Sequence, residues 1–179
     1  MTLHIICGPM FSGKSSELIM RYKRQSAVRK RCLMVNHASD VRVSGNAAAT
    51  HSGTRVNGIK ASSILEVLKH LNTIEVDSIF IDEAQFFDDL HQVRQLAQYY
   101  DVHLAGLVSD YQQNPIGKLH MLMCAADNIT FCRALCHMCG KPAPFTRRVV
   151  QGDQQILVGA VSEYRAVCRG HLTGDMILL

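Results

Sequence analysis

The segment from Gly8 to Ser15 constrains this chain most, because a glycine and four variable residues are followed by Gly-Lys-Ser. Backbone N–H groups in a loop of this spacing surround an anion, and the positive end of the following helix points at the same place. The apolar run from Leu3 to Cys7 indicates a strand before the loop, and helical spacing from Ser15 to about Val28 follows it. A glycine-containing turn is the alternative. The context favours a phosphate-binding loop formed by Gly8, Pro9, Met10, Phe11, Ser12, Gly13, Lys14 and Ser15.

Two side chains at the end of this loop and two acids after a later strand match the needs of phosphoryl transfer. We expect Lys14 to reach the β- and γ-phosphates of ATP, and the Ser15 hydroxyl to bind Mg²⁺. The apolar run from Ser78 predicts a strand that delivers Asp82 and Glu83 at its carboxyl end, where open α/β sheets bind ligands. Asp82 is expected to share the Mg²⁺ with Ser15, and Glu83 to act as the general base. A helix-capping acid is the commoner reason for such a strand end.

Composition is that of an ordinary globular protein. The chain has 179 residues, of which 47% are hydrophobic and 19% are charged, and its net charge is +4. This size fits one domain with a small appendage. Apolar runs are short and the N-terminus enters a strand without a basic leader, so we expect a cytoplasmic protein without a membrane partner. Basic residues from Arg21 to Arg31 are interpreted as a solvated helix face, with a nucleic-acid surface as the minor alternative.

Strands and helices are predicted to alternate along most of the chain. A capping box, Ser63 with Glu66, begins one of the helices. Residues 37–58 lack periodicity and are predicted to form a mobile loop that covers a site. The alternation predicts an α/β fold, a P-loop NTPase-like parallel sheet flanked by helices on both faces. Beyond the first pair, strands are expected at Cys32–Asn36, Ser78–Asp82, Val102–Val108 and near Ile129–Leu135, and helices at Ser63–Asn72, Leu90–Tyr99 and around Leu119–Ala126.

Seven cysteines are present, and their odd number in a reducing compartment argues against disulfides. Cys136 and Cys139, then Cys168 and His171, form ligand pairs separated by 28 residues. Each short spacing lets one turn present two ligands, so the four predict a closed, structural Zn²⁺ site. Accidental spacing is the alternative. We expect a nucleotide-binding domain at 1–135 and a small zinc-binding domain at 136–179. Four other cysteines are predicted to be core thiols: Cys7, Cys32, Cys124 and Cys132.

Taken together, the loop from Gly8 to Ser15, the run IDEAQFF from Ile81 to Phe87 and the two ligand pairs resemble the type II thymidine kinases of animals, bacteria and large DNA viruses. The resemblance covers nearly the whole chain. It implies transfer of the γ-phosphoryl group of ATP to the 5′-hydroxyl of thymidine or deoxyuridine. It also implies a zinc-tied loop, the lasso, which holds the base mainly through backbone groups. Members are usually homotetramers and are inhibited by thymidine triphosphate.

The same resemblance implies which residues bind the nucleoside. Phe86 matches the pocket position better than Phe87, although aromatic residues at strand ends are more often core. Thr146 is expected beside the base with Arg148 in support, and Tyr164 across the lasso. The full expected set is Met10, Asp40, Arg42, Glu83, Phe86, Leu107, Tyr111, Thr146, Leu157, Val158, Gly159 and Tyr164.

Two positions depart from the family pattern. Val108 stands where the family has an aspartate, so that role is absent or is supplied by another acid such as Asp110. Ile116 stands where many members have phenylalanine, which leaves more room beside the base. Two other classes remain open: a zinc-ribbon P-loop ATPase acting on nucleic acid, and a nucleotide-binding regulator. The first needs a broad basic surface and motor motifs that do not stand out, and the second has no reason to keep Glu83.

Overall fold

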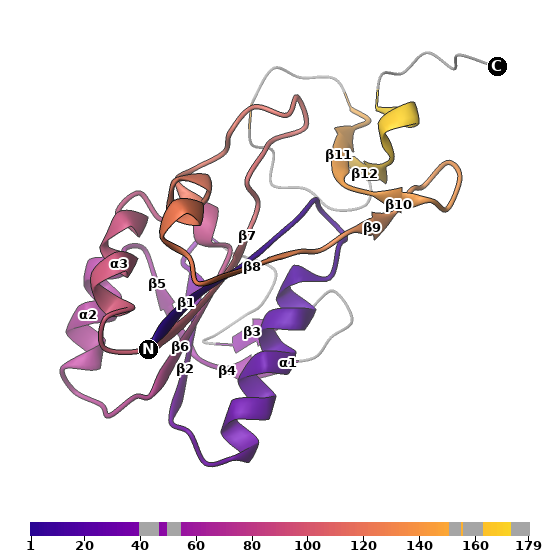
Figure 1. Cartoon of the computed structure of the whole chain (residues 1–179). Helices are drawn as coiled ribbons and strands as arrows, with labels where there is room; N and C mark the ends of the chain where they lie inside the picture. Colours follow the sequence, from indigo (N-terminus) through magenta and orange to yellow (C-terminus); the bar gives the residue numbers. More distant parts are fainter. Residues whose placement is uncertain (40–46, 50–54, 151–154, 156–162, 173–179) are drawn as a thin grey trace.

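The computed structural model describes residues 1–39, 47–49, 55–150, 155 and 163–172. Its centre is a parallel six-stranded sheet in the order β5-β2-β6-β7-β1-β8 (Figure 1). The predicted α/β class is therefore confirmed. Within the described part of the chain, no helix combines the length and apolarity that crossing a membrane requires.

The predicted strands of the sheet are confirmed with small shifts at their ends, except that the last of them ends earlier than expected. An additional strand, β5, pairs with β2 and was not predicted, because three residues are too few to show a periodicity. The bounds of the sheet strands are Thr2–Cys7 (β1), Cys32–His37 (β2), Ile59–Ala61 (β5), Ser78–Asp82 (β6), Asp101–Gly106 (β7) and Asn128–Phe131 (β8).

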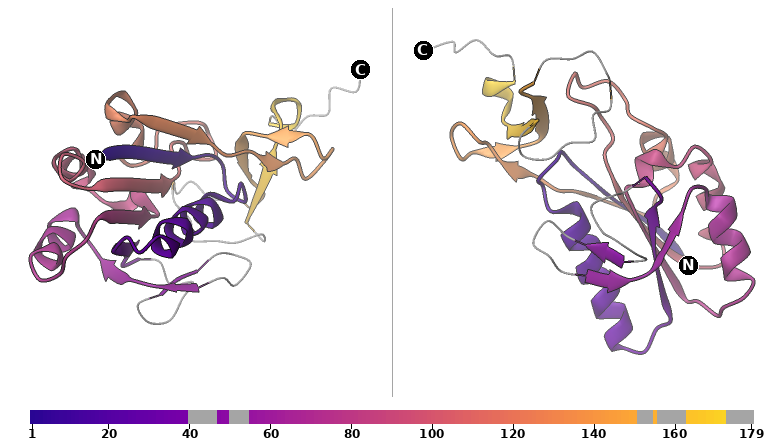
Figure 2. Two further views of the ribbon diagram at one scale, coloured as in Figure 1. Left: turned by 60° about the horizontal axis from the view of Figure 1, so that its bottom comes forward. Right: turned by 180° about the vertical axis from the view of Figure 1, so that it is seen from behind.

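Helices cover both faces of the sheet, as predicted (Figure 2). Helix α1, Lys14–Ala27, packs with Leu18 and Ile19 on one face, against Phe80 of β6. Helices α2, Ile64–Leu71, and α3, Val93–Leu96, pack on the other. Because each face is covered, β6 is buried at all five positions, as expected for a central parallel strand.

Two predicted helices and one predicted loop differ from the structure. The expected helix from Leu90 to Tyr99 is shorter, a turn of 3₁₀ helix, η2 at Leu90–Gln92, that continues into α3. The expected helix near Leu119 is the 3₁₀ helix η3, Leu119–Ala125. The loop predicted at 37–58 contains two short strands, β3 at Ala47–Ala49 and β4 at Arg55–Asn57, which pair antiparallel. Residues 40–46 and 50–54 lie outside the described part, so the predicted mobility is not tested.

The predicted final strand is divided in two. Strand β8 ends at Phe131, and the chain passes the start of the phosphate loop, where Cys132 N–H donates to the Cys7 carbonyl at 2.7 Å. Strand β9 then begins a separate group of short strands with its own apolar cluster, which lies beyond the end of the sheet (Figure 1). We call this group the small module: Ala134–Leu135 (β9), Pro142–Ala143 (β10), Phe145–Arg148 (β11), Tyr164–Val167 (β12) and the 3₁₀ turn Arg169–His171 (η4).

The four cysteines predicted as core thiols differ in burial. Cys7 is buried, and Cys32 and Cys132 are half-buried. Burial raises the pKa of all three thiols. Cys124 is exposed, so its assignment to the core is wrong. It lies in the 3₁₀ helix η3, whose buried residues are Leu119 and Leu122, and so it falls on the outer side of that turn.

Candidate nucleotide and nucleoside site

The phosphate loop joins β1 to α1, as predicted. Gly8 has φ of 149°, and a Cβ there would lie 2.2 Å from the backbone oxygen of Cys132, so no other residue fits without moving the chain. Lys14 Nζ donates to the Pro9 carbonyl at 2.7 Å, and Ser12 Oγ donates to the same oxygen at 2.8 Å. The lysine is thus folded back over its own loop, at the N-terminus of α1 where an anion is favoured.

The two predicted acids lie at the same edge of the sheet as the loop. Asp82 ends β6, and β7 alone separates β6 from β1 in the sheet. Because the strands are parallel, the carboxyl ends of β6 and β1 point the same way, as ligand binding at this edge requires. Asp82 is 3% exposed, and its Oδ1 accepts from the Glu83 N–H at 3.0 Å. Glu83 follows in a left-handed conformation, φ 52° and ψ 40°, and its side chain is half-buried.

The small module is hydrogen-bonded to the phosphate loop. Met10 N–H donates to Thr146 Oγ1 at 2.9 Å, although 136 positions separate the two residues. Thr146 is 7% exposed, and Phe11 packs against the apolar cluster of the module. The expected nucleoside residue Thr146 is therefore fixed to the expected phosphate residue Met10, which joins the two predicted parts of the site.

Aromatic side chains divide between core and site edge. Phe87 is 1% exposed and belongs to the core, whereas Phe86 is half-buried, 5.7 Å from His37 between ring centroids. Phe86, the ring expected to contact the nucleoside, is thus the more accessible of the two. The Arg148 guanidinium lies over the Tyr111 ring, 5.4 Å from its centroid. Tyr164 is 5% exposed and lies opposite Arg148 in the β11–β12 pair.

Asp110, the suggested substitute for the family aspartate, stabilises its own loop. Its Oδ1 accepts from the backbone N–H groups of Gln112 at 2.8 Å and Asn114 at 2.9 Å. Its Oδ2 accepts from Gln155 Nε2 at 3.0 Å, so this acid also holds a residue of the predicted lasso. Ile116 is 4% exposed and Val108 packs against the main core, so both departures are apolar packing positions.

The predicted metal ligands come together. The ligand atoms of Cys136, Cys139, Cys168 and His171 all lie within 4.8 Å of one another. Two turns present them: the Gly140 N–H donates to the Cys136 carbonyl at 2.8 Å, and the His171 N–H donates to the Cys168 carbonyl at 3.0 Å. Three sulfurs and one imidazole in this space fit a tetrahedral zinc ion, and His137 between the first pair is not part of the cluster.

The thiol environment supports metal binding. Burial opposes ionisation of Cys136, but backbone hydrogen bonds from Cys168, Met138 and Cys139 outweigh it and lower the pKa of Cys136 to about 6. A backbone hydrogen bond from Lys141 lowers the pKa of Cys139, but burial and the neighbouring sulfurs of Cys136 and Cys168 together outweigh it, so the pKa is raised. Crowded thiols of this kind ionise together only when a cation neutralises them.

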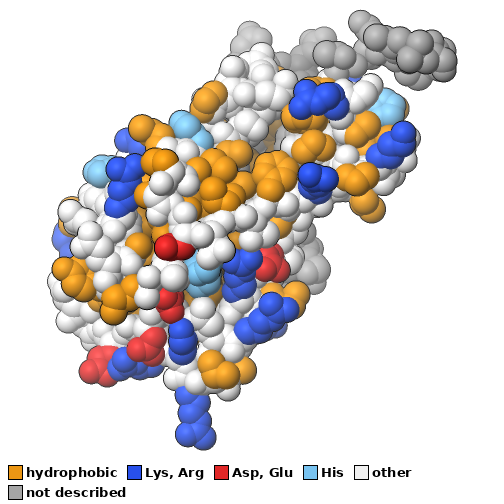
Figure 3. Space-filling view, in the orientation of Figure 1, with side chains coloured by type: hydrophobic (Ala, Val, Ile, Leu, Met, Phe, Trp, Pro, Cys, Tyr) orange, Lys and Arg blue, Asp and Glu red, His pale blue; other side chains and the backbone are white. Residues whose placement is uncertain are grey.

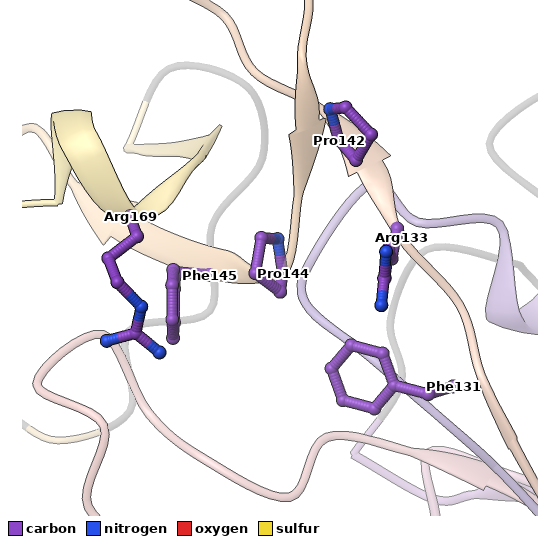
Figure 4. Close-up of a pocket in the computed structure, with 6 residues that line it drawn as sticks. All are labelled: Phe131, Arg133, Pro142, Pro144, Phe145 and Arg169. Atoms are coloured by element: carbon purple, nitrogen blue, oxygen red, sulfur yellow. The ribbon is translucent and has the colours of Figure 1, made fainter.

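A pocket lies outside the predicted site, between the end of β8 and the small module (Figure 4). Its walls combine phenyl rings, proline rings and guanidinium groups, and Arg169 lies over the Phe145 ring at 4.8 Å. No predicted nucleotide or nucleoside residue takes part. The lining residues are Phe131, Arg133, Pro142, Pro144, Phe145 and Arg169.

Five expected substrate residues fall outside the described part of the chain: Asp40, Arg42, Leu157, Val158 and Gly159. One residue of the site was missed. Gln85 lies inside the run IDEAQFF, and its amide connects Glu83 to the backbone of Leu107. The signal in the sequence was its position two residues after the predicted base. A glutamine that is buried there needs hydrogen-bonding partners, and Glu83 is near enough to be one.

These features define a P-loop nucleotide-binding α/β protein with an acid pair at the phosphate edge and a Cys₃His module beside it. The thymidine kinase family model matches residues 1–172, and the chain belongs to that family. It is similar to a thymidine kinase from Bacteroides thetaiotaomicron, with 39% identity over 170 residues that cover 93% of this chain and 84% of that protein.

Proposed function

We propose that this protein transfers the γ-phosphoryl group of ATP to the 5′-hydroxyl of thymidine or deoxyuridine. One observation carries the proposal: in a chain of the thymidine kinase family, the phosphate loop and the Asp82–Glu83 pair share one edge of the sheet, with a single strand between them. Glu83 accepts the hydroxyl proton, and Lys14 stabilises charge on the transferred group. Ser15 and Asp82 hold the Mg²⁺ that accompanies ATP.

The nucleoside lies between the small module and the carboxyl-terminal edge of the sheet, where the phosphate loop and the acid pair are. The hydrogen bond between Met10 and Thr146, and the half-buried rings of Phe86 and Tyr111, support this location. Leu107 follows β7 directly, and Tyr164 lies in β12, opposite Arg148 of β11. Asp40, Arg42 and residues 157–159 complete the proposed set. In this assignment residues 1–135 bind ATP, and residues 136–179 cover the nucleoside.

The Cys₃His cluster binds one structural zinc ion. Four protein ligands leave no open coordination position, so the ion orders the module and takes no part in the chemistry. Cys136 belongs to the same apolar cluster as Ala166 and Val167 of β12, and this supports the role, because β11 and β12 carry Thr146 and Tyr164.

The protein acts in the cytoplasm as a homotetramer that thymidine triphosphate inhibits. Support for self-association comes from the edge strand β8, where Ile129 and Phe131 remain 44% and 47% exposed. Figure 3 shows apolar side chains gathered over the end of this strand. Exposed apolar surface at a sheet edge is typical of protein interfaces.

Replacing Glu83 by glutamine tests the chemical assignment. Glutamine keeps the shape but cannot accept the proton, so the rate of thymidine phosphorylation should fall roughly 10²–10⁴-fold while ATP binding stays nearly constant. Glu75→Gln is the matched control, because the Glu75 side chain is 86% exposed on the surface. A Glu83→Gln enzyme with full activity would show that the base is another group.

A further inference from the structure

Gln85 is buried beside the proposed base. It lies in the 3₁₀ turn η1, Ala84–Phe86, two residues after Glu83, and is 4% exposed. Glutamine is mostly found at protein surfaces, because its amide has two donors and an acceptor to satisfy. Its burial here therefore requires specific partners.

Both ends of the Gln85 amide have partners. The Leu107 N–H, at the end of β7, donates to Gln85 Oε1 at 2.9 Å. Gln85 Nε2 donates to Glu83 Oε2 at 2.6 Å. The backbone donor at Leu107 fixes which end of the amide is oxygen, so the NH₂ group faces the Glu83 carboxylate.

Two glycines make room for this arrangement. A Cβ on Gly106 would lie 2.5 Å from Gln85 Oε1, and it would also crowd the Ala84 backbone nitrogen at 3.2 Å. A Cβ on Gly117, whose φ is 54°, would lie 2.0 Å from the Gln85 backbone oxygen. The Gln85 backbone and amide thus pack closely against the chain at Gly106 and Gly117, and a side chain at either position would displace them.

We propose that Gln85 is a positioning residue that holds the Glu83 carboxylate in the orientation that accepts the nucleoside proton. The inference rests on the proposed role of Glu83 as base. Glu83 sits on a left-handed backbone at the mouth of the site, and its short charge-assisted hydrogen bond to Gln85 restricts its rotamers. A neutral amide provides this restraint without the full positive charge that would weaken a base.

The test is a double-mutant cycle between Gln85→Met and Glu83→Gln, with kcat and both KM values measured for ATP and thymidine. Methionine keeps the length of the side chain and removes both hydrogen bonds. Since a misplacement of about 1 Å can cost about 10²-fold, we expect kcat to fall roughly 10–100-fold with KM values changed less than about threefold. In the Glu83→Gln background, Gln85→Met should cause no further loss, because the base it positions is gone.

Controls separate positioning from folding. Gln95→Met changes an exposed glutamine in the same part of the chain and should leave kcat unchanged. If Gln85→Met does not fold, Gln85→Glu replaces it: this isostere still accepts from the Leu107 N–H, but it places a second carboxyl group beside Glu83, so the two acids share a proton and the pH profile of kcat should shift to higher pH. Unchanged kcat in a folded Gln85 variant, or equal losses in both backgrounds, would overturn the inference. Full activity in Glu83→Gln alone would instead contradict the proposed base and leave the two failures distinguishable.

Discussion

Thr146 links the module to the phosphate loop through a single hydroxyl, and its replacement gives a clear residue-scale prediction. Thr146→Val keeps the β-branched shape but leaves the Met10 N–H without its acceptor. Losing the acceptor of a fully buried donor costs about 1–3 kcal/mol. Because Met10 is half-buried, the free energy of unfolding should fall by an amount near the lower end of this range. We also expect the KM for thymidine to rise more than the KM for ATP, because Thr146 belongs to the module that is proposed to cover the nucleoside.

Urea unfolding and steady-state kinetics would measure both effects. Thr146→Ser is the matched control, because serine retains the hydroxyl acceptor and should keep most of the stability and the KM. If Thr146→Val and Thr146→Ser behave alike, the methyl group matters and the hydrogen bond does not.

The sequence predicted the location of those site residues whose positions are fixed by local spacing. The phosphate loop is contiguous, the acid pair follows a strand, and each metal pair fits in one turn, so all three were predicted. Asp89 shows the opposite case. Its carboxylate accepts from the N–H groups of Ile64 at 2.8 Å and Leu65 at 3.0 Å, and so it caps a helix 25 positions away. A contact between distant segments leaves no pattern in sequence spacing.

At the scale of elements, the same limit explains the incorrect helices and the divided strand. The sequence predicted helices near Leu90 and Leu119, but 3₁₀ and α turns share much of the same apolar spacing. The break after Phe131 comes from the approach of Cys132 to Cys7 and Gly8, more than 120 positions earlier. Local propensity continues the strand, and long-range packing ends it.

The two turns that present the proposed zinc ligands should control the order of the small module. Cys168→Ser removes one of four ligands, and we expect zinc content to fall well below one ion per chain. Amide exchange in β11 and β12 should accelerate, because a structural zinc supplies much of the folding energy of such a small unit. Elemental analysis and hydrogen exchange measure these effects. Cys124→Ser, at an exposed cysteine outside the cluster, is the control. Full zinc content in Cys168→Ser would remove this cysteine from the ligand set.

A ring stack across three strands makes stability depend on pH. His103 on β7 lies between Phe80 on β6 and His4 on β1, with ring centroids 4.6 and 4.5 Å apart. Burial, then the charges of His4 and Arg21, lowers the pKa of His103 to about 4 from 6.5, although Asp101 opposes this. The folded state therefore binds fewer protons than the unfolded chain between these values. The contribution of neutral His103 to the free energy of unfolding is therefore complete above pH 6.5, and it is lost as the pH falls toward 4.

His103→Phe keeps a ring in the stack and removes this titration. As the pH falls from 6.5 to 5, the free energy of unfolding of the wild type should decrease more steeply than that of His103→Phe. The difference in slope should be up to about 1.4 kcal/mol per pH unit for one proton. The slope is the readout, so a constant offset from the lost contact to Gln25 does not matter. His91→Gln, at an exposed position, should keep the wild-type slope. Equal slopes in wild type and His103→Phe would show that His103 is not the titrating group.

At the scale of the whole molecule, helices cover both faces of the sheet, but its β8 edge carries exposed apolar side chains. If the proposed tetramer uses this edge, Phe131→Asp should place a charge in an apolar interface and shift the protein to smaller species. A buried, unpaired charge costs several kcal/mol, enough to dissociate an interface of ordinary size. Sedimentation velocity across a concentration series measures the change. Leu65→Asp is the matched control. Leu65 is also exposed, at 50%, but it lies on α2, on the far side of the sheet from α1, and is not part of the β8 edge. A tetramer that survives Phe131→Asp and dissociates with Leu65→Asp would locate the interface on the α2 face instead.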